Sequence, residues 1–135
     1  MVPVGGWVGY RLAMPATPAA PLERIRATCM ALPDVTERPS HGEPEWFAAN
    51  GRAFASLAER DLDGRVAVWC SAAPGAQEQL VESDPGRFFR PPYVGVRGWV
   101  GIWLDGSKTD WERTTRLVRE AHAIEVARRH PGAGA

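Results

Sequence analysis

Apolar residues recur every three or four positions in a segment near the start of the chain, as they do on one face of an α-helix. The segment begins at Pro21, a residue that the first turn of a helix tolerates, and Pro33 ends it. Its apolar positions are Leu22, Ile25, Cys29 and Leu32. The pattern predicts a helix over residues 21–32.

Two further helices are predicted nearer the C-terminus. Pro74-Gly75 opens one of them, and the bias of a pre-proline residue against helical backbone ends it before Pro85. The last helix is expected over residues 110–129. Thr109 and Glu112 have the spacing of a capping box, so we expect each to satisfy a free backbone N–H group of the other. The apolar side of this helix consists of Trp111, Leu117, Val118, Ala121 and Ile124.

Shorter apolar segments between turn residues predict an antiparallel sheet. Residues 46–49 and 52–57 flank Asn50-Gly51, a dipeptide that suits a β-hairpin turn. Asp63-Gly64 then separates the second of these strands from residues 65–70, which extends the hairpin into a meander. A further strand is expected over residues 99–104.

The alternation along the last two strands assigns their faces. Val66, Val68 and Cys70 share one face, as do Val100, Ile102 and Leu104, and both sets are aliphatic or thiol side chains that helices can cover. We therefore predict that the first and last helices bury Ile25, Cys29, Val118 and Ala121 against these strands. The opposite faces carry Trp69, Trp99 and Trp103. This arrangement predicts a tryptophan-bearing surface without helices over it, unless the N-terminal tail, loops or a second copy of the chain cover it.

Length and composition place these elements in one α+β domain. The chain has 135 residues, of which 44% are apolar, enough for one core. We expect a flexible tail over residues 1–20, in which Met14 could be the translation start, and a single domain over residues 21–130. Sixteen basic and sixteen acidic residues give zero formal charge, which excludes a whole-molecule field toward nucleic acid or an anionic membrane.

The cysteines and the N-terminus favour a cytoplasmic protein. Cys29 and Cys70 have no CxxC partner and lie in apolar patterns, so buried, reduced thiols are expected. The N-terminal MVPVGGWVGYRLAM has no charged n-region, and glycines interrupt its apolar residues, so it does not match a secretory signal. No segment is apolar for long enough to form a transmembrane helix.

Three stretches in this order resemble the MmcQ/YjbR-like proteins over roughly residues 22–125. They are ERIRATCMALPDVTERPSHGEPEWF, VWCSAAPGAQEQLVESDPGRFFRPPYVGVRGWVGIWLD and DWERTTRLVREAH. The resemblance implies a CyaY-like, two-layer α+β fold in which helices pack on one face of an antiparallel meander sheet. It also implies DNA binding through a "double wing" arrangement. It supplies no catalytic residues.

The SHGEP segment, residues 40–44, is the first candidate site. His41 beside Glu43 and Ser40 could form an acid/base pair, but no exposed nucleophile elbow completes a catalytic set. His41, Glu43 and Glu45 could offer metal ligands, yet no further histidine has a workable spacing. The interpretation we favour is a polar loop in which His41 braces the entry to a strand. The loop consists of Arg38, Ser40, His41 and Glu43.

The second candidate site lies in residues 85–99, where arginines alternate with aromatic residues. Cations suit phosphates and rings suit exposed bases, so this segment predicts nucleic-acid binding. The candidate residues are Arg87, Arg90, Tyr93, Arg97 and Trp99. A structural alternative pairs the arginines with Glu37, Glu43 or Glu45.

These observations predict a binding module without catalytic residues, cofactor or metal. The leading ligand is DNA, as the family resemblance implies. The alternative is a protein partner, or a second copy of the chain, docked on the face that carries Trp69, Trp99 and Trp103. A third possibility is a small-molecule enzyme site at the SHGEP segment.

Overall fold

The computed structural model of the chain describes residues 20–59, 65–104 and 109–128. The expected tail, except for its last residue, and the Asp63-Gly64 turn lie outside the described residues. The elements in chain order are α1 (Pro21–Met30), β1 (Thr36–Ser40), β2 (Glu43–Phe47), β3 (Ala53–Ala58), β4 (Ala67–Cys70), α2 (Ala76–Ser83), β5 (Phe88–Phe89), the 3₁₀ helix η2 (Val94–Arg97), β6 (Val100–Trp103) and α3 (Trp111–Ala127).

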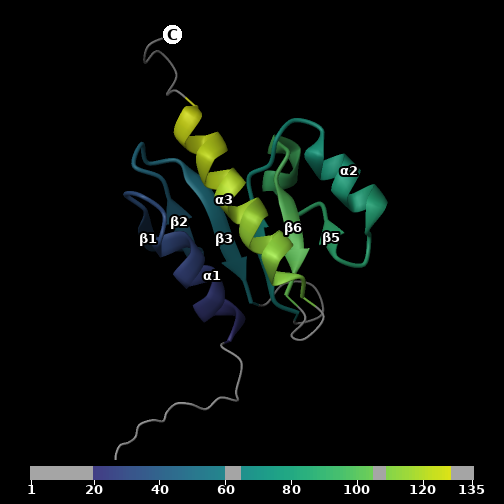
Figure 1. The fold of residues 1–135 in the computed structure, drawn as a ribbon, viewed down its shortest axis with the longest axis horizontal. Helices are drawn as coiled ribbons and strands as arrows, with labels where there is room; N and C mark the ends of the chain where they lie inside the picture. The colour runs from purple at the N-terminus through teal and green to yellow at the C-terminus, as the bar shows by residue number, and fades with distance from the viewer. Residues whose placement is uncertain (1–19, 60–64, 105–108, 129–135) are drawn as a thin grey trace, which may run out of the picture.

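The strands form one sheet in the order β1-β2-β3-β4-β6-β5, and every neighbouring pair is antiparallel. Helices α1 and α3 pack side by side on one face of this sheet (Figure 1). Helix α2 lies beside β5, away from the α1–α3 pair. The predicted α+β fold, with helices on one face of a meander, is therefore confirmed.

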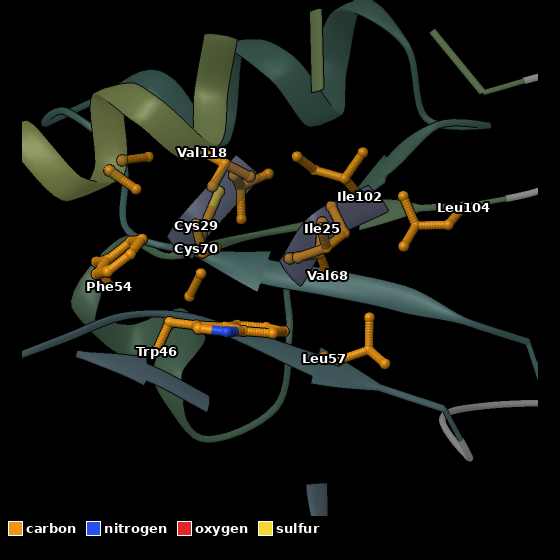
Figure 2. Packing of buried hydrophobic residues seen from close by; sticks show 14 of the residues in the cluster. Ile25, Cys29, Trp46, Phe54, Leu57, Val68, Cys70, Ile102, Leu104 and Val118 are labelled. Atoms are coloured by element: carbon orange, nitrogen blue, oxygen red, sulfur yellow. The ribbon is translucent and has the colours of Figure 1, made fainter. Parts of the chain in front are cut away.

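The core lies between the sheet and the α1–α3 pair, as the alternation predicted. Ile25 and Cys29 of α1 and Val118 of α3 face the strands, where they meet Val68 and Ile102 (Figure 2). All five residues are at most 1% exposed. The aliphatic face is thus the helix-covered face, and the opposite face of the sheet has neither α1 nor α3 over it.

Asn50 and Gly51 lie in the turn between β2 and β3, as predicted, but the loop has three residues rather than two. The N–H of Ala48 donates to the carbonyl of Arg52, and Gly51 has φ 85°. A type I turn followed by a left-handed glycine has this form. The Asn50 side chain donates to the carbonyl of Glu125 at 2.9 Å, so the loop is also tied to the end of α3.

The TERPSHGEPEWF stretch is a hairpin of its own, which the sequence pattern did not predict. Strand β1 pairs with β2 along its whole length, with Pro39 opposite Pro44. Prolines and charged residues are unfavourable in the interior of a sheet, but β1 is an edge strand, where a proline need not donate to a further neighbour.

The predicted capping box at the start of the last helix is wrong. Asp110, rather than Thr109, is the N-cap of α3, and its carboxylate accepts a 3.0 Å hydrogen bond from the N–H of Arg113. The Thr109 hydroxyl is buried without a hydrogen-bond partner among the described residues. Aspartate at this position adds a negative charge at the positive end of the helix, which favours it over the threonine one residue earlier.

The helix-free face does not expose its three tryptophans: Trp99 and Trp103 are buried, and Trp69 is only partly exposed. Trp99 is 2% and Trp103 is 9% exposed. The Phe89 ring stacks on Trp103 with centroids 4.3 Å apart, and the Arg65 guanidinium lies 3.8 Å from the centroid of the same indole. Loop and edge-strand residues therefore cover this end of the face, which was the alternative considered for it.

Candidate functional site

A cavity of about 700 Å³ lies on the helix-free face of the sheet. Its lining residues come from three parts of the chain that are distant in sequence: the SHGEP segment, the middle strands and the segment that follows β5. Its lining residues are Ser40, His41, Glu43, Glu45, Ser56, Leu57, Ala58, Trp69, Pro92, Tyr93, Val94 and Trp99.

The floor of the cavity follows from the strand register. Glu45 of β2 lies opposite Ser56 of β3, and Ser56 lies opposite Trp69 of β4. These three side chains therefore form a row across the sheet, with a small residue between a carboxylate and an indole. Ala58, the next residue of β3 on this face, is also small. The sheet is hollow here because β3 fills neither position with a large side chain.

One wall of the cavity is the β1–β2 turn. His41 and Gly42 have φ 55° and 82°, and positive values at both central residues are what a type I′ hairpin turn requires. The turn places the exposed His41 at the cavity rim. Behind it, the Glu43 carboxylate accepts a 3.2 Å hydrogen bond from the N–H of Glu59, which fixes Glu43 against the end of β3.

The opposite wall contains a strained turn centred on Tyr93. Its backbone has φ 65° and ψ −66°, and the N–H of Val94 donates to the carbonyl of Pro92 at 2.7 Å. This is the geometry of a γ-turn of the rare, strained kind. The Tyr93 side chain is 88% exposed. Such strain costs on the order of 1–3 kcal/mol per residue and tends to be retained where a binding or catalytic site needs it.

Gln77 of α2 holds this wall in place. Its buried amide donates to the carbonyls of Gly95 and Trp99, at 2.8 and 2.5 Å. The short η2 helix, which contains Gly95 and ends just before Trp99, is thereby fixed to α2. Sequence analysis missed Gln77, although a glutamine directly after the Pro-Gly-Ala helix start was a detectable signal.

The electrostatics of the cavity are acidic. Glu43 and Glu45 line it, and none of the described lysine and arginine residues does. Arg38 lies opposite Glu45 in the register, but its guanidinium stacks on Phe47, 3.9 Å from the ring centroid. The Trp69 Nε1–H in the floor is buried without a hydrogen-bond partner among the described residues. Arg38 itself lines a different, more open hollow of about 590 Å³ beside Asp34 and Phe47.

The arginines predicted to contact nucleic acid lie outside the cavity. Arg87 forms a 3.1 Å ion pair with Asp84, and the Arg97 guanidinium lies 5.3 Å from the Trp99 ring centroid. The Arg90 side chain is exposed but lies against Gly95. A Cβ atom added to Gly95 would be 2.7 Å from Cγ of Arg90. Glu37, one of the acids considered as their partner, pairs with Arg26 instead, at 2.7 Å.

Of the residues predicted as sites, the structure therefore brings one subset together. Ser40, His41 and Glu43 of the polar loop line the same cavity as Tyr93, Trp99 and Trp69. The residues that do not line it are Arg38, Arg87, Arg90, Arg97 and Trp103. Ser56 and Ala58 were missed, because a small residue gives no signal of its own: Ser56 matters because it lies between Glu45 and Trp69, and Ala58 because it leaves the next position of β3 on this face small.

Two other features bear on function. Across the described ranges, no group of three histidine, cysteine, aspartate or glutamate side chains is arranged to hold a metal ion. Within the same ranges, no helix is both long enough and apolar enough to cross a membrane.

Comparison with known proteins places the chain in a family. A sequence model of the family described as YjbR matches residues 30–124, well over half of the 135 residues. The chain belongs to the YjbR family. Every residue that lines the cavity falls within the matched span. No curated protein sequence matches the chain.

One solved structure extends the comparison to the YjbR fold. The crystal structure of Deinococcus radiodurans protein DR2400, described with a DUF419 domain, is similar with a TM-score of 0.67. The two sequences are 18% identical, and the match covers 79% of each chain. At this identity the similarity concerns the α+β fold and does not extend to ligands.

Proposed function

We propose that this protein is a binding module whose ligand occupies the cavity on the helix-free face of the sheet. The observation that supports this most is the convergence of the His41-Gly42 turn, the Glu45–Ser56–Trp69 row and the strained Tyr93 turn around one hollow. A concave site with aromatic walls and a few fixed polar groups is the usual form of a small-ligand site.

An NMR titration tests this proposal. A panel of small aromatic compounds of differing charge is added to ¹⁵N-labelled protein, and the Trp69 indole N–H and the amides of Ser56 and Tyr93 are followed. Ligands of the cavity shift these signals together and saturably. Ser56→Phe, which fills the hollow from its floor, abolishes the shifts, whereas Ala123→Phe on the exposed side of α3 leaves them. Shifts confined to other surfaces, or absent for the whole panel, would refute the proposal.

A second candidate function, nucleic-acid binding, has one observation in its favour. Arg90, Tyr93 and Arg97 are exposed on a single short segment at the edge of the cavity. Guanidinium groups would contact phosphates there, and Tyr93 would stack on an unpaired base. Because Trp99 is buried, Tyr93 replaces it as the ring open to stacking.

Labelled single- and double-stranded DNA, titrated at two salt concentrations, distinguishes this candidate. Arg90→Ala and Arg97→Ala should weaken binding to all sequences about equally, and should reduce the salt dependence. Tyr93→Ala should weaken single-strand binding chiefly. DNA binding that is absent at low salt, or unchanged after loss of both arginines, would remove this candidate without affecting the cavity proposal.

A further inference from the structure

Given the proposed cavity site, we infer that its ligand is an organic cation, a guanidinium or ammonium group next to a flat or apolar body. The inference rests on the proposed function and specifies the charge and shape of what binds. The two carboxylates and the rings of Trp69 and Tyr93 support it, as does a lining in which the described residues include no lysine or arginine.

The carboxylates supply the charge selectivity. Glu45 is half-buried and has no ion-pair or hydrogen-bond partner among the described residues. Glu43 already accepts one backbone hydrogen bond through Oε2, which orients the group and leaves Oε1 for a ligand. A carboxylate at this depth is screened less than one on an open surface, so it attracts a cation and repels an anion more strongly.

The rings supply the second half of the site. Trp69 comes from β4 and Tyr93 from the start of the η2 segment, and both line the cavity. Indole and phenol rings attract cations to their faces, and a site with several rings together with carboxylates is a common form of amine recognition. Trp99 also lines the cavity, but it is 2% exposed and the Arg97 guanidinium lies 5.3 Å from its ring centroid, so it is not one of the rings open to a ligand.

The neighbouring arginines do not turn the site into an anion site. Arg38 lies opposite Glu45 in the register, but its guanidinium is stacked on Phe47 and it lines another hollow. Arg97 is exposed, and it does not line the cavity either. A phosphate or carboxylate in the cavity would therefore meet two carboxylates and, among the described residues, no lining lysine or arginine.

A matched series of ligands tests the inference on the wild-type protein. Benzamidine, benzamide and benzoate share one ring and carry a positive, zero and negative charge. Titrated separately and followed at the Trp69 indole N–H, benzamidine should bind at least about tenfold more tightly than benzoate, with benzamide between them. Equal binding of all three in the cavity would overturn the inference while the proposed function stands. Cavity shifts from none of the three would count against both.

Charge-removing variants provide an independent readout. Glu45→Gln and Glu43→Gln keep the size of the side chain, and the amide oxygen that Glu43→Gln introduces can still accept from the Glu59 N–H. Each variant should weaken benzamidine binding about fivefold or more while benzamide binding stays the same. Glu112→Gln on the exposed side of α3 is the control and should change neither. Unchanged benzamidine binding in both cavity variants would overturn the inference.

The cation could belong to a free compound or to a side chain of another protein, and two further ligands separate these sources. Acetylarginine amide and a glycine pentapeptide with one central arginine carry the same guanidinium group. Equal affinities support a free cation, and tighter binding of the peptide supports an arginine side chain. Failure of both to shift the cavity signals, in a protein that binds benzamide there, would overturn the inference.

Discussion

Glu37 shows how one residue can organise the beginning of the fold. Its carboxylate accepts from the Arg26 guanidinium at 2.8 and 2.7 Å and from the Trp46 indole N–H at 2.9 Å. These bonds connect α1, β1 and β2 through a single side chain. The hydrogen bonds from Arg26, and secondly the one from Trp46, lower the pKa of Glu37, although partial burial opposes them.

A pH prediction follows at this residue. Because the pKa of Glu37 is lower in the folded than in the unfolded chain, its contribution to stability is complete above the unfolded value, about 4.3, and is lost as the pH falls through the folded value. Glu37→Gln should therefore reduce the loss of stability between about pH 5 and the folded pKa. Urea unfolding at several pH values measures this. A variant with the same pH dependence as the wild type would contradict the account.

The two cysteines give a second prediction at the residue scale. Both are fully buried, and burial is the main cause that raises the pKa of each thiol, in Cys70 to about 12. Since the thiolate is the reactive species, neither residue should react with a thiol reagent in the folded protein near neutral pH. Two thiols should become reactive on unfolding. Fast labelling of either thiol under native conditions would show that the core opens readily.

At the scale of elements, the packing of β5 against β6 depends on a glycine, Gly101. Phe89 lies opposite Gly101, and a Cβ at Gly101 would stand 2.3 Å from Cζ of the Phe89 ring. Gly101→Ala should therefore displace the ring from Trp103 and reduce the free energy of unfolding by about 1–3 kcal/mol. Gly86→Ala, with its nearest such atom 3.9 Å away, is the control. Equal stabilities of the two variants would contradict this packing.

Gln77 gives the corresponding prediction for the cavity wall. Gln77→Leu leaves the carbonyls of Gly95 and Trp99 without their donor, which should cost about 1–3 kcal/mol. The amides of residues 95–99 should then exchange with solvent faster, and ligand affinity should fall. Gln79→Leu, exposed on the same helix, should change none of these. Unaltered exchange in Gln77→Leu would mean that other contacts hold η2.

The elements that the sequence predicted are those with a local signal. Helical spacing and proline boundaries located α1, α2 and α3, and the period-two pattern assigned the faces of β4 and β6. Strand β1 was missed because its prolines and charges oppose a strand locally, and only pairing with β2 overrides them. Strand β5 has two residues, too few for any periodicity.

The candidate site was predictable only in pieces. His41, Glu43, Tyr93 and Trp99 were singled out for their chemical types, but nothing in the sequence placed them around one hollow. That placement depends on the register of β2, β3 and β4 and on the anchoring of η2, both of which are tertiary. Ser56 and Ala58 could not be recognised as part of a floor until the strand register, which places Ser56 between Glu45 and Trp69, was known.

At the scale of the whole molecule, zero net charge conceals local separation of charge. The cavity presents carboxylates, whereas Arg90 and Arg97 are exposed on the segment that forms its wall. The two proposed functions thus involve surfaces of opposite charge that share Tyr93. Raising the salt concentration should weaken DNA binding steeply, but should weaken the binding of a neutral ligand in the cavity little.

The central claim, that the helix-free cavity is a ligand site, is tested most directly by nuclear Overhauser contacts between protein and bound ligand. With benzamidine as the ligand, the account predicts contacts from its ring to the Trp69 indole and Ser56 of the floor and to Tyr93 of the wall at once. Contacts only to the hollow around Asp34 and Phe47, or only to the outer side chains of Arg90 and Arg97, would contradict it.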